Sequence, residues 1–259
     1  MRLLLTNDDS IDSVFLHELV FAMIRAGHEV FVAAPKTEQS WIGAAKSRHR
    51  AVHATPVDRG FGCPTWVIDG TPSDCVNIAL AHLLPVKPDG VISGINLGFN
   101  ASLGFILASG TIAGAWEGAV HGLPGVALSQ DLSLESFELV RTTKGRGSEG
   151  VLNVVRESAA RAAQLAPELI GSTAPRSFTV HNLNFPSSYQ PSTEVRRTVP
   201  ARVVIPGLFS PAADDGTHRF IFKAGDDISS PEPLTDRAAL RDGHISHTVL
   251  DYRVLGVWT

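Results

Sequence analysis

Short apolar runs alternate with helix-spaced apolar residues along the first half of the chain. Such runs are typical of buried strands, and the spacing between them is typical of helices that cover a sheet. The predicted strands are Arg2–Thr6, His28–Ala34, Thr65–Ile68, Gly90–Ser93 and Gly125–Leu128, and the predicted helices are Val14–Arg25, Pro72–Leu84 and Thr111–His121. This alternation predicts an α/β protein, with a parallel sheet covered on both faces and any ligand at the carboxyl ends of the strands.

The second half of the chain has a different character. Residues 131–148 mix Ser, Thr, Gly and charge, which predicts a mobile or protruding connection before a long helix over 149–165. Three extended segments with Pro between them, Phe178–Phe185, Glu194–Ile205 and Arg219–Lys223, predict antiparallel strands or a hairpin arm. We expect a single domain over residues 1–259, with a core at about 1–186 and an extended C-terminal arm and tail at about 187–259.

Composition and charge narrow the class of function without assigning one. Apolar residues make up 44% of the chain and charged residues 19%, and no apolar stretch is long enough to span a membrane. The start of the chain has no signal-peptide pattern, so we expect a cytoplasmic protein with no membrane partner. A formal net charge of −4 gives no general attraction to nucleic acid polymers, so phosphate binding requires a local site or a metal ion. Cys63 and Cys75 do not make a disulfide framework and are expected to be packing residues.

Two neighbouring carboxylates, Asp8 and Asp9, directly follow the first predicted strand. Their mutual repulsion is relieved if both bind one hard divalent cation. Asn96 follows the strand Gly90–Ser93 and offers a neutral oxygen, which suits Mg²⁺ or Mn²⁺ beside two carboxylates. The alternatives are structural, because one Asp can cap the next helix while the other is solvated, and Asn96 can be an Asx-turn residue.

Ser109, Gly110 and Thr111 stand where a helix is predicted to begin. Small residues at a helix N-terminus let backbone N–H groups approach an anion, and the two hydroxyls can add donors, so a phosphate could bind here. Equally, Ser109 or Thr111 can simply be the N-cap. Around Thr71 the structural interpretation is favoured, because Pro72 and Asp74 complete a capping-box arrangement.

Several motifs occur together in this chain. They are Asn7-Asp8-Asp9, Gln39-Ser40, Gly70-Thr71-Pro72-Ser73-Asp74-Cys75-Val76, Ser93-Gly94-Ile95-Asn96-Leu97-Gly98-Phe99-Asn100 and Ser109-Gly110-Thr111. Their order and spacing resemble the SurE survival-protein family, and shorter matches extend the likeness to nearly the whole chain. The resemblance implies a three-layer α/β/α, Rossmann-like fold with a C-terminal β-hairpin arm.

The resemblance also implies an activity and a set of site residues. The activity is that of a metal-dependent phosphatase that hydrolyses nucleoside 5′- or 3′-monophosphates, and in some members short polyphosphate, as a homodimer or homotetramer with exchanged arms. The implied ligands of one Mg²⁺ or Mn²⁺ per subunit are Asp8, Asp9, Ser40 and Asn96, of which Asp8, Asp9 and Asn96 are also the expected catalytic residues. The implied phosphate site is Asn100, Ser109, Gly110 and Thr111.

Three departures from the family pattern fall beside these residues. Ser10 and Trp41 stand where members usually have Gly, and Ala108 stands where they usually have Tyr. Ser10 would force a different backbone angle if that glycine needed a positive φ, and Trp41 places a ring at the expected pocket mouth, where it can stack on a base or narrow the entrance. The departures leave the preferred phosphate ester open.

Two other classes of function are alternatives to a phosphatase. A family member whose catalysis has been lost through these departures would be a metal-assisted nucleotide or phosphate-ligand binding protein, because fold and motif do not guarantee activity. A dinucleotide-binding enzyme is disfavoured, because the first strand is followed by carboxylates and lacks the G-x-G-x-x-G turn.

Overall fold

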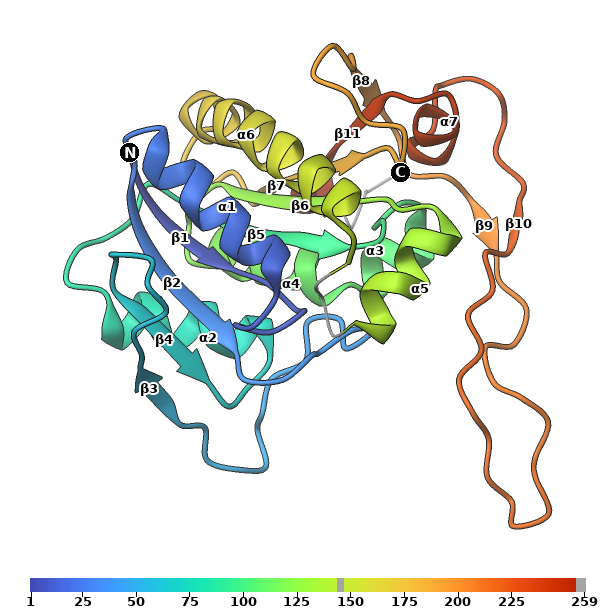
Figure 1. Ribbon diagram of the computed structural model, residues 1–259, viewed down its shortest axis with the longest axis horizontal. Coiled ribbons are helices and arrows are strands. Elements are labelled where there is room, and N and C mark those ends of the chain that lie inside the picture. The colour runs from blue at the N-terminus through green and yellow to red at the C-terminus, as the bar shows by residue number, and fades with distance from the viewer. Residues whose placement is uncertain (144–146, 255–259) are drawn as a thin grey trace.

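The computed structural model describes residues 1–143 and 147–254, and its centre is a nine-stranded, mostly parallel sheet (Figure 1). The strand order is β3-β4-β2-β1-β5-β6-β7-β11-β8, and β3 and β11 run antiparallel to β4 and β7. The strands are β1 (Arg2–Thr6), β2 (Glu29–Pro35), β3 (Ala54–Pro56), β4 (Thr65–Ile68), β5 (Gly90–Leu97), β6 (Gly125–Gln130), β7 (Thr179–Phe185), β8 (Val195–Thr198) and β11 (Ile245–Asp251).

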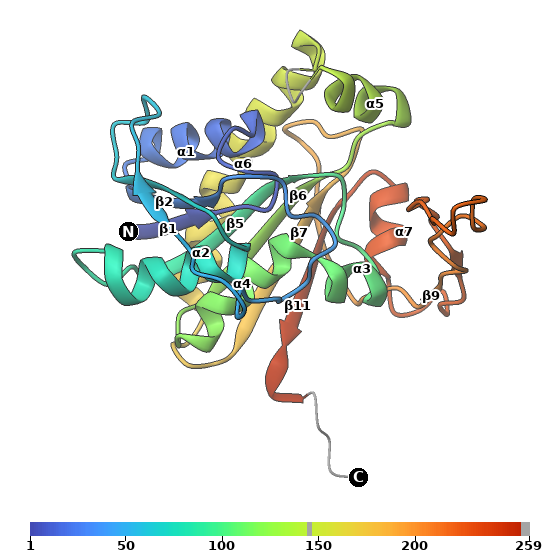
Figure 2. The same cartoon turned by 90° about the horizontal axis from the view of Figure 1, so that it is seen from below.

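Helices cover both faces of this sheet, which confirms the predicted three-layer α/β/α fold (Figure 2). The pair α1 (Val14–Arg25) and α6 (Glu149–Ser172) covers one face, and the pair α2 (Pro72–Ile78) and α4 (Gly110–Val120) covers the other. Three shorter helices are α3 (Leu103–Ala108), α5 (Leu134–Thr142) and α7 (Asp236–Arg241). A π-helical turn, Ala79–Leu83, continues α2, and a 3₁₀ turn, Tyr252–Val254, follows β11. Across the described ranges, no helix is both long and apolar enough to cross a membrane.

The central strand β1 shows how the apolar pattern builds the two layers. Leu3 and Leu5 are fully buried in the cluster beneath α1 and α6, while Leu4 is fully buried in the cluster beneath α2. Successive side chains of a strand point to opposite faces, so an unbroken apolar run is what a doubly covered strand requires. Strand β1 lies between β2 and β5, so its carboxyl end is in the middle of the row of strand ends along one edge of the sheet.

Helix α4 approaches the sheet closely enough to bring its first turn to the same edge. A Cβ added at Gly114 would lie 2.8 Å from Thr6 Cγ2 and 2.9 Å from Ser93 Oγ, so only glycine fits there. The close approach sets the N-terminus of α4 beside the ends of β1 and β5. The fold therefore brings together the two segments in which functional residues were expected.

Several predicted boundaries need correction. Strand β5 continues beyond Ser93 to Leu97 after a register shift against β6, so Asn96 lies on a strand and not in the turn that follows it. Residues 131–148 are not wholly a mobile or protruding connection, because 134–142 form α5, although 144–146 lie outside the described residues. The long helix also extends past Leu165, through Pro167, to Ser172.

The C-terminal region is divided between the main sheet and a hairpin arm. Strands β8 and β11 join β7 beyond residue 186, so the sheet extends past the expected core boundary. The arm, residues 203–227, begins and ends with the two-stranded pair β9 (Val203–Val204) and β10 (Asp226–Asp227), and it projects from the body (Figure 1). The segment Arg219–Lys223 lies in this hairpin arm, which was one of the two predicted alternatives, and within it Phe220 forms an antiparallel bridge to Phe209.

A histidine pair links β7 to β11. His181 Nδ1 and His247 Nε2 are 2.9 Å apart, and Thr173 Oγ1 is 2.7 Å from His181 Nε2. Burial, with a smaller contribution from the positive charge of Arg197, lowers the pKa of both histidines to about 4. Both rings are therefore neutral in the folded protein near neutral pH.

This pair predicts a loss of stability in mild acid. Between about pH 6.5 and about pH 4 the unfolded chain takes up protons that the folded pair does not, so stability is greatest above that window and falls as the pH drops through it. We expect the Tm to fall between about pH 7.5 and about pH 5, and the fall to be smaller in His247→Gln. Thermal unfolding of both proteins measures this, and an unchanged pH dependence in the variant would contradict it.

Candidate functional site

Asp8 and Asp9 are held by contacts from two different elements at the carboxyl end of β1. The Thr111 hydroxyl, in the first turn of α4, donates to Asp8 Oδ1 at 2.6 Å. The Leu97 backbone N–H, at the end of β5, donates to Asp9 Oδ2 at 2.9 Å. Each carboxylate is thus fixed through one oxygen, which leaves its second oxygen available.

The two carboxylates occupy an environment that disfavours their charges. Burial raises the pKa of Asp8 to about 6, against the lowering effect of its hydrogen bond from Thr111. Burial, followed by the charge of Asp8, raises the pKa of Asp9 well above its usual range, and the nearby Glu38 raises the pKa of both. Two neighbouring acids, of which Asp8 is buried, are costly to ionise together unless positive charge offsets them.

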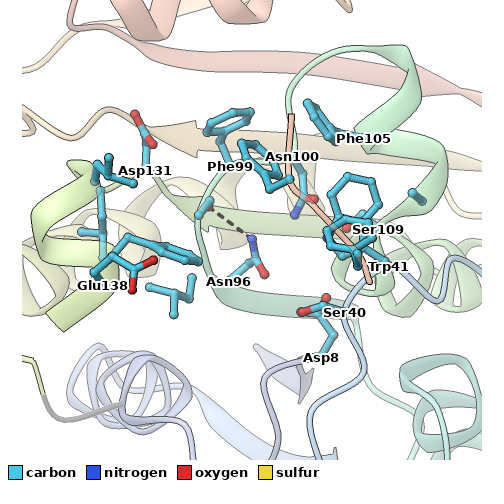
Figure 3. A pocket seen from close by; sticks show the side chains of 18 residues that line it. Asp8, Ser40, Trp41, Asn96, Phe99, Asn100, Phe105, Ser109, Asp131 and Glu138 are labelled. Carbon is cyan, nitrogen blue, oxygen red and sulfur yellow. Dashed lines mark hydrogen bonds between the residues drawn. The ribbon is translucent and has the colours of Figure 1, made fainter. Parts of the chain in front are cut away.

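Asn96 and Ser40 add neutral oxygens near this pair. Asn96 is buried, and its Nδ2 donates to the Gly98 carbonyl at 3.2 Å, so the side-chain oxygen is turned away from that bond (Figure 3). Ser40, on the loop after β2, is exposed and fixed through its backbone N–H, which donates to Glu38 at 2.8 Å. Figure 3 places Ser40 beside Asp8 below Asn96.

These four side chains fit a hard divalent cation. Among the described residues, each keeps one side-chain oxygen that accepts no hydrogen bond: Asp8 Oδ2, Asp9 Oδ1, Ser40 Oγ and Asn96 Oδ1. Within that part of the chain, no three His, Cys, Asp or Glu side chains are grouped as a metal site, so a cation here depends on the neutral oxygens as well. Carboxylate and amide oxygens are the ligands that Mg²⁺ and Mn²⁺ favour.

The first turn of α4 divides the predicted phosphate residues into two groups. Ser109 is the N-cap, accepts from the Ile112 N–H at 3.0 Å, and lines a cavity next to Asp8. Gly110 and Thr111 do not line that cavity, because they pack against Asp8, and the Thr111 hydroxyl is directed to its carboxylate. The structure therefore presents one of the two expected hydroxyls to a ligand, and its proton remains available for donation.

Asn100 is buried and lines the same cavity. Its N–H donates to Asn184 at 2.7 Å, its side-chain amide donates to Ser129 at 2.9 Å, and its carbonyl accepts from Asn182 at 2.8 Å. Neighbouring strands thus fix both the backbone and the amide of Asn100. Asn182 and Asn184 on β7 thus hold the loop that carries Asn100.

The cavity has a volume of about 650 Å³, within the range of small-molecule sites. One side carries Trp41, Phe105 and Ser109, and the other carries Asp131 and Glu138 (Figure 3). The lining residues that sequence reasoning missed come from β5 and α3, from the region of α5, and from the arm: Leu97, Gly98, Phe99, Phe105, Asp131, Leu132, Leu134, Phe137, Glu138, Phe220 and Phe222. The apolar residues Leu134, Phe137 and Val140, spaced three apart, were the available signal for α5.

Two of the three departures keep the backbone geometry typical of glycine. Ser10 has φ +82° and Trp41 has φ +60°, both in the left-handed region. A side chain in this region costs about 1–2 kcal/mol relative to glycine. The chain therefore keeps the loop geometry around Asp9 and Ser40 in spite of the larger residues, and Trp41 lines the cavity as expected.

Relief of this strain is predicted to stabilise the protein. Ser10→Gly removes the steric cost but adds freedom to the unfolded chain, so we expect a net gain of about 0.5–1 kcal/mol in the free energy of unfolding. Urea denaturation measures the gain. Ser10→Ala is the control, because it keeps the Cβ and should show no gain. A Ser10→Gly protein less stable than the wild type would contradict the argument.

The fold and this edge define a doubly wound α/β protein with an acidic, cation-compatible site beside a helix N-terminus. The family model described as "Survival protein SurE" matches residues 3–204, and the chain belongs to that family. A relative named 5'-nucleotidase SurE, from Solidesulfovibrio magneticus, is 36% identical over 98% of this chain and 92% of its own length. Another relative of that name, from Pelotomaculum thermopropionicum, is 31% identical over 98% of this chain and 93% of its own length. The crystal structure of the SurE protein from Aquifex aeolicus matches with a TM-score of 0.72 at 26% identity, over 98% of this chain and 97% of that one.

Proposed function

We propose that this protein is a divalent-metal-dependent phosphatase that hydrolyses nucleoside 5′- or 3′-monophosphates. Its family includes relatives named 5'-nucleotidase, which are hydrolases of phosphoric monoesters. The observation that carries the proposal is that Asp8, Ser40 and Asn96 line the same cavity as Ser109, each with a side-chain oxygen free to bind a cation, while Asp9 adjoins Asp8 and is fixed by the Leu97 N–H.

Different residues of the site would bind the cation and the phosphate. Asp8, Asp9, Ser40 and Asn96 would hold one Mg²⁺ or Mn²⁺, which supplies positive charge to the phosphate oxygens and to the attacking water. The Ser109 hydroxyl would donate to the phosphate, and the positive end of the α4 dipole would stabilise its equatorial oxygens. Asn100, fixed by Ser129 and Asn184, limits the position of the ester.

In an alternative version of the reaction, Asp8 or Asp9 acts as the general base that takes a proton from the attacking water. Water attack is the version we favour over an aspartyl-phosphate route. Trapping a covalent phosphoenzyme would overturn this choice.

The exchanged arms expected from the resemblance suggest a homodimer or homotetramer. The arm exposes large apolar side chains, and Phe209 and Val204 are 62% and 54% exposed. Exposed apolar surface of this kind is typical of subunit contacts. Light scattering tests this part of the proposal, and a monomer at all concentrations would contradict it.

A substrate screen tests the activity itself. Purified protein is incubated with nucleoside 5′- and 3′-monophosphates, a sugar phosphate and short polyphosphate, with EDTA or with added Mn²⁺ or Mg²⁺, and released phosphate is measured. We expect release from nucleoside monophosphates that EDTA abolishes and the cation restores. No release from any ester with either cation would overturn the proposal in favour of a binding protein.

A further inference from the structure

Four aromatic side chains from three parts of the chain form one wall of the cavity, which we call the aromatic wall: Trp41, Phe105, Phe220 and Phe222. The Trp41 ring centroid lies 5.3 Å from that of Phe105 and 5.0 Å from that of Phe220. Phe222 stacks on Phe105 at 5.8 Å with 19° between the ring planes. The hairpin arm therefore contributes directly to the cavity beside the proposed phosphate site.

Helix α7 fixes both ends of the arm against the cavity. Asp236 accepts from the Ala201 N–H, just before the arm, and from the Ser102 N–H, just before α3, each at 2.9 Å. Arg237 donates to the Ala224 carbonyl, near the other end of the arm, at 3.2 Å. The arm is therefore held in register with the loop that carries Phe105.

Arg237 also supports the wall from behind. Its guanidinium lies over Phe99 at 4.6 Å and over Phe105 at 4.9 Å, and its Nε donates to the Ala101 carbonyl at 3.4 Å. Cation–π contacts of this kind hold aromatic rings in a fixed orientation. Phe105, which is 5% exposed, is thus enclosed by other groups, and it is the buried ring against which Trp41 and Phe222 pack.

The other three rings of the wall keep free surface. Trp41, Phe220 and Phe222 are 39%, 45% and 55% exposed, although large apolar side chains normally lie inside a protein. All three border the cavity whose polar end holds Asp8, Ser40 and Asn96. A phosphate ester bound at the polar end would therefore bring its leaving group to the aromatic wall.

We propose that the aromatic wall is the leaving-group subsite and selects phosphate monoesters with a planar aromatic group, with Phe220 and Phe222 of the arm as specificity-determining residues. The inference rests on the proposed phosphatase activity. Its physical basis is that free ring faces stack on a planar base irrespective of its hydrogen-bonding pattern. Purine and pyrimidine esters are both accepted, and esters without an aromatic ring are discriminated against.

The test compares two esters that differ only in the base, AMP and ribose 5-phosphate. The kcat/KM of each is measured with Mn²⁺ for the wild type, Phe220→Ala, Phe222→Ala and Ile221→Ala. Ile221 is the matched control, because it lies between the two phenylalanines, is 43% exposed and does not line the cavity. We expect the kcat/KM for AMP, divided by that for ribose 5-phosphate, to fall about tenfold in each phenylalanine variant, mainly because the KM for AMP rises. The ratio in Ile221→Ala should equal that of the wild type.

The outcomes separate this inference from the proposed function. If the wild type releases phosphate from neither ester, the phosphatase assignment fails. If the wild type is active but the phenylalanine variants keep its ratio, or Ile221→Ala loses it equally, the subsite is wrong and the activity stands.

Discussion

Asp9→Asn is expected to lower phosphate release from nucleoside monophosphates on the order of 10²- to 10³-fold, the loss typical of removing one electrostatic group from an active site. Asn is close to Asp in size, and its oxygen can still accept the 2.9 Å hydrogen bond from Leu97 N–H. Its charge is lost, and with it most of the attraction for a divalent cation. The rate at saturating Mn²⁺ and the Mn²⁺ concentration needed for half-activity both measure the effect.

The same substitution should not unfold the protein. Because burial and the charge of Asp8 both disfavour an ionised Asp9, its neutralisation removes a repulsion, and the metal-free variant should have a Tm equal to or above that of the wild type. Asp12→Asn is the matched control, since Asp12 pairs with Arg59 on the surface and does not line the cavity. A fully active Asp9→Asn enzyme would refute the role assigned to this carboxylate.

Gly110→Ala is expected to cost about 10²-fold in kcat, as a displacement of about 1 Å does when it disturbs catalytic groups. A Cβ at this position would lie 2.9 Å from Asp8 Cβ, 3.0 Å from Asp8 Oδ2 and 3.0 Å from the Gln39 carbonyl. One of these neighbours is backbone, so the strain cannot be relieved by a side-chain rotation alone. Asp8 and the loop that carries Ser40 must both shift.

Gly171→Ala is the control for this change. Gly171 is also helical, in α6, and nothing lies within 4 Å of an added Cβ. Alanine there should leave the rate unchanged and raise stability by up to about 1 kcal/mol, because alanine is the better helix former. Steady-state rates and thermal unfolding of both variants separate the local clash from a general effect of the substitution. Wild-type turnover by Gly110→Ala would show that close approach to Asp8 is not required.

The first half of the fold could be predicted because its signals are local. Helix α1 and strands β1 and β4 have the predicted bounds, since apolar periodicity and the residues that end each element lie within the segment itself. The capping box at Thr71 and Asp74 was also predicted, and both of its hydrogen bonds are present. Proximity of Asp8 to the first turn of α4 followed from the rule that parallel strands end at one edge.

The parts that were missed depend on contacts distant in the chain. Strand β11 inserts between β7 and β8, and only the pairing of residues far apart in sequence decides that position. The arm residues Phe220 and Phe222 line the cavity because their rings pack against Trp41 and Phe105, far away in the sequence, and no local pattern encodes that contact. The Thr111 hydroxyl was predicted to be a donor to the phosphate. In the structure it donates to Asp8 Oδ1, a contact that local sequence does not reveal.

The most direct test of a cation site at this edge is a crystal soaked in Mn²⁺ and measured at a wavelength where manganese scatters anomalously. The account predicts a single anomalous peak per chain, within coordination distance of Asp8, Asp9, Ser40 and Asn96. An edge without a peak, with these four side chains turned away from one another, would contradict it.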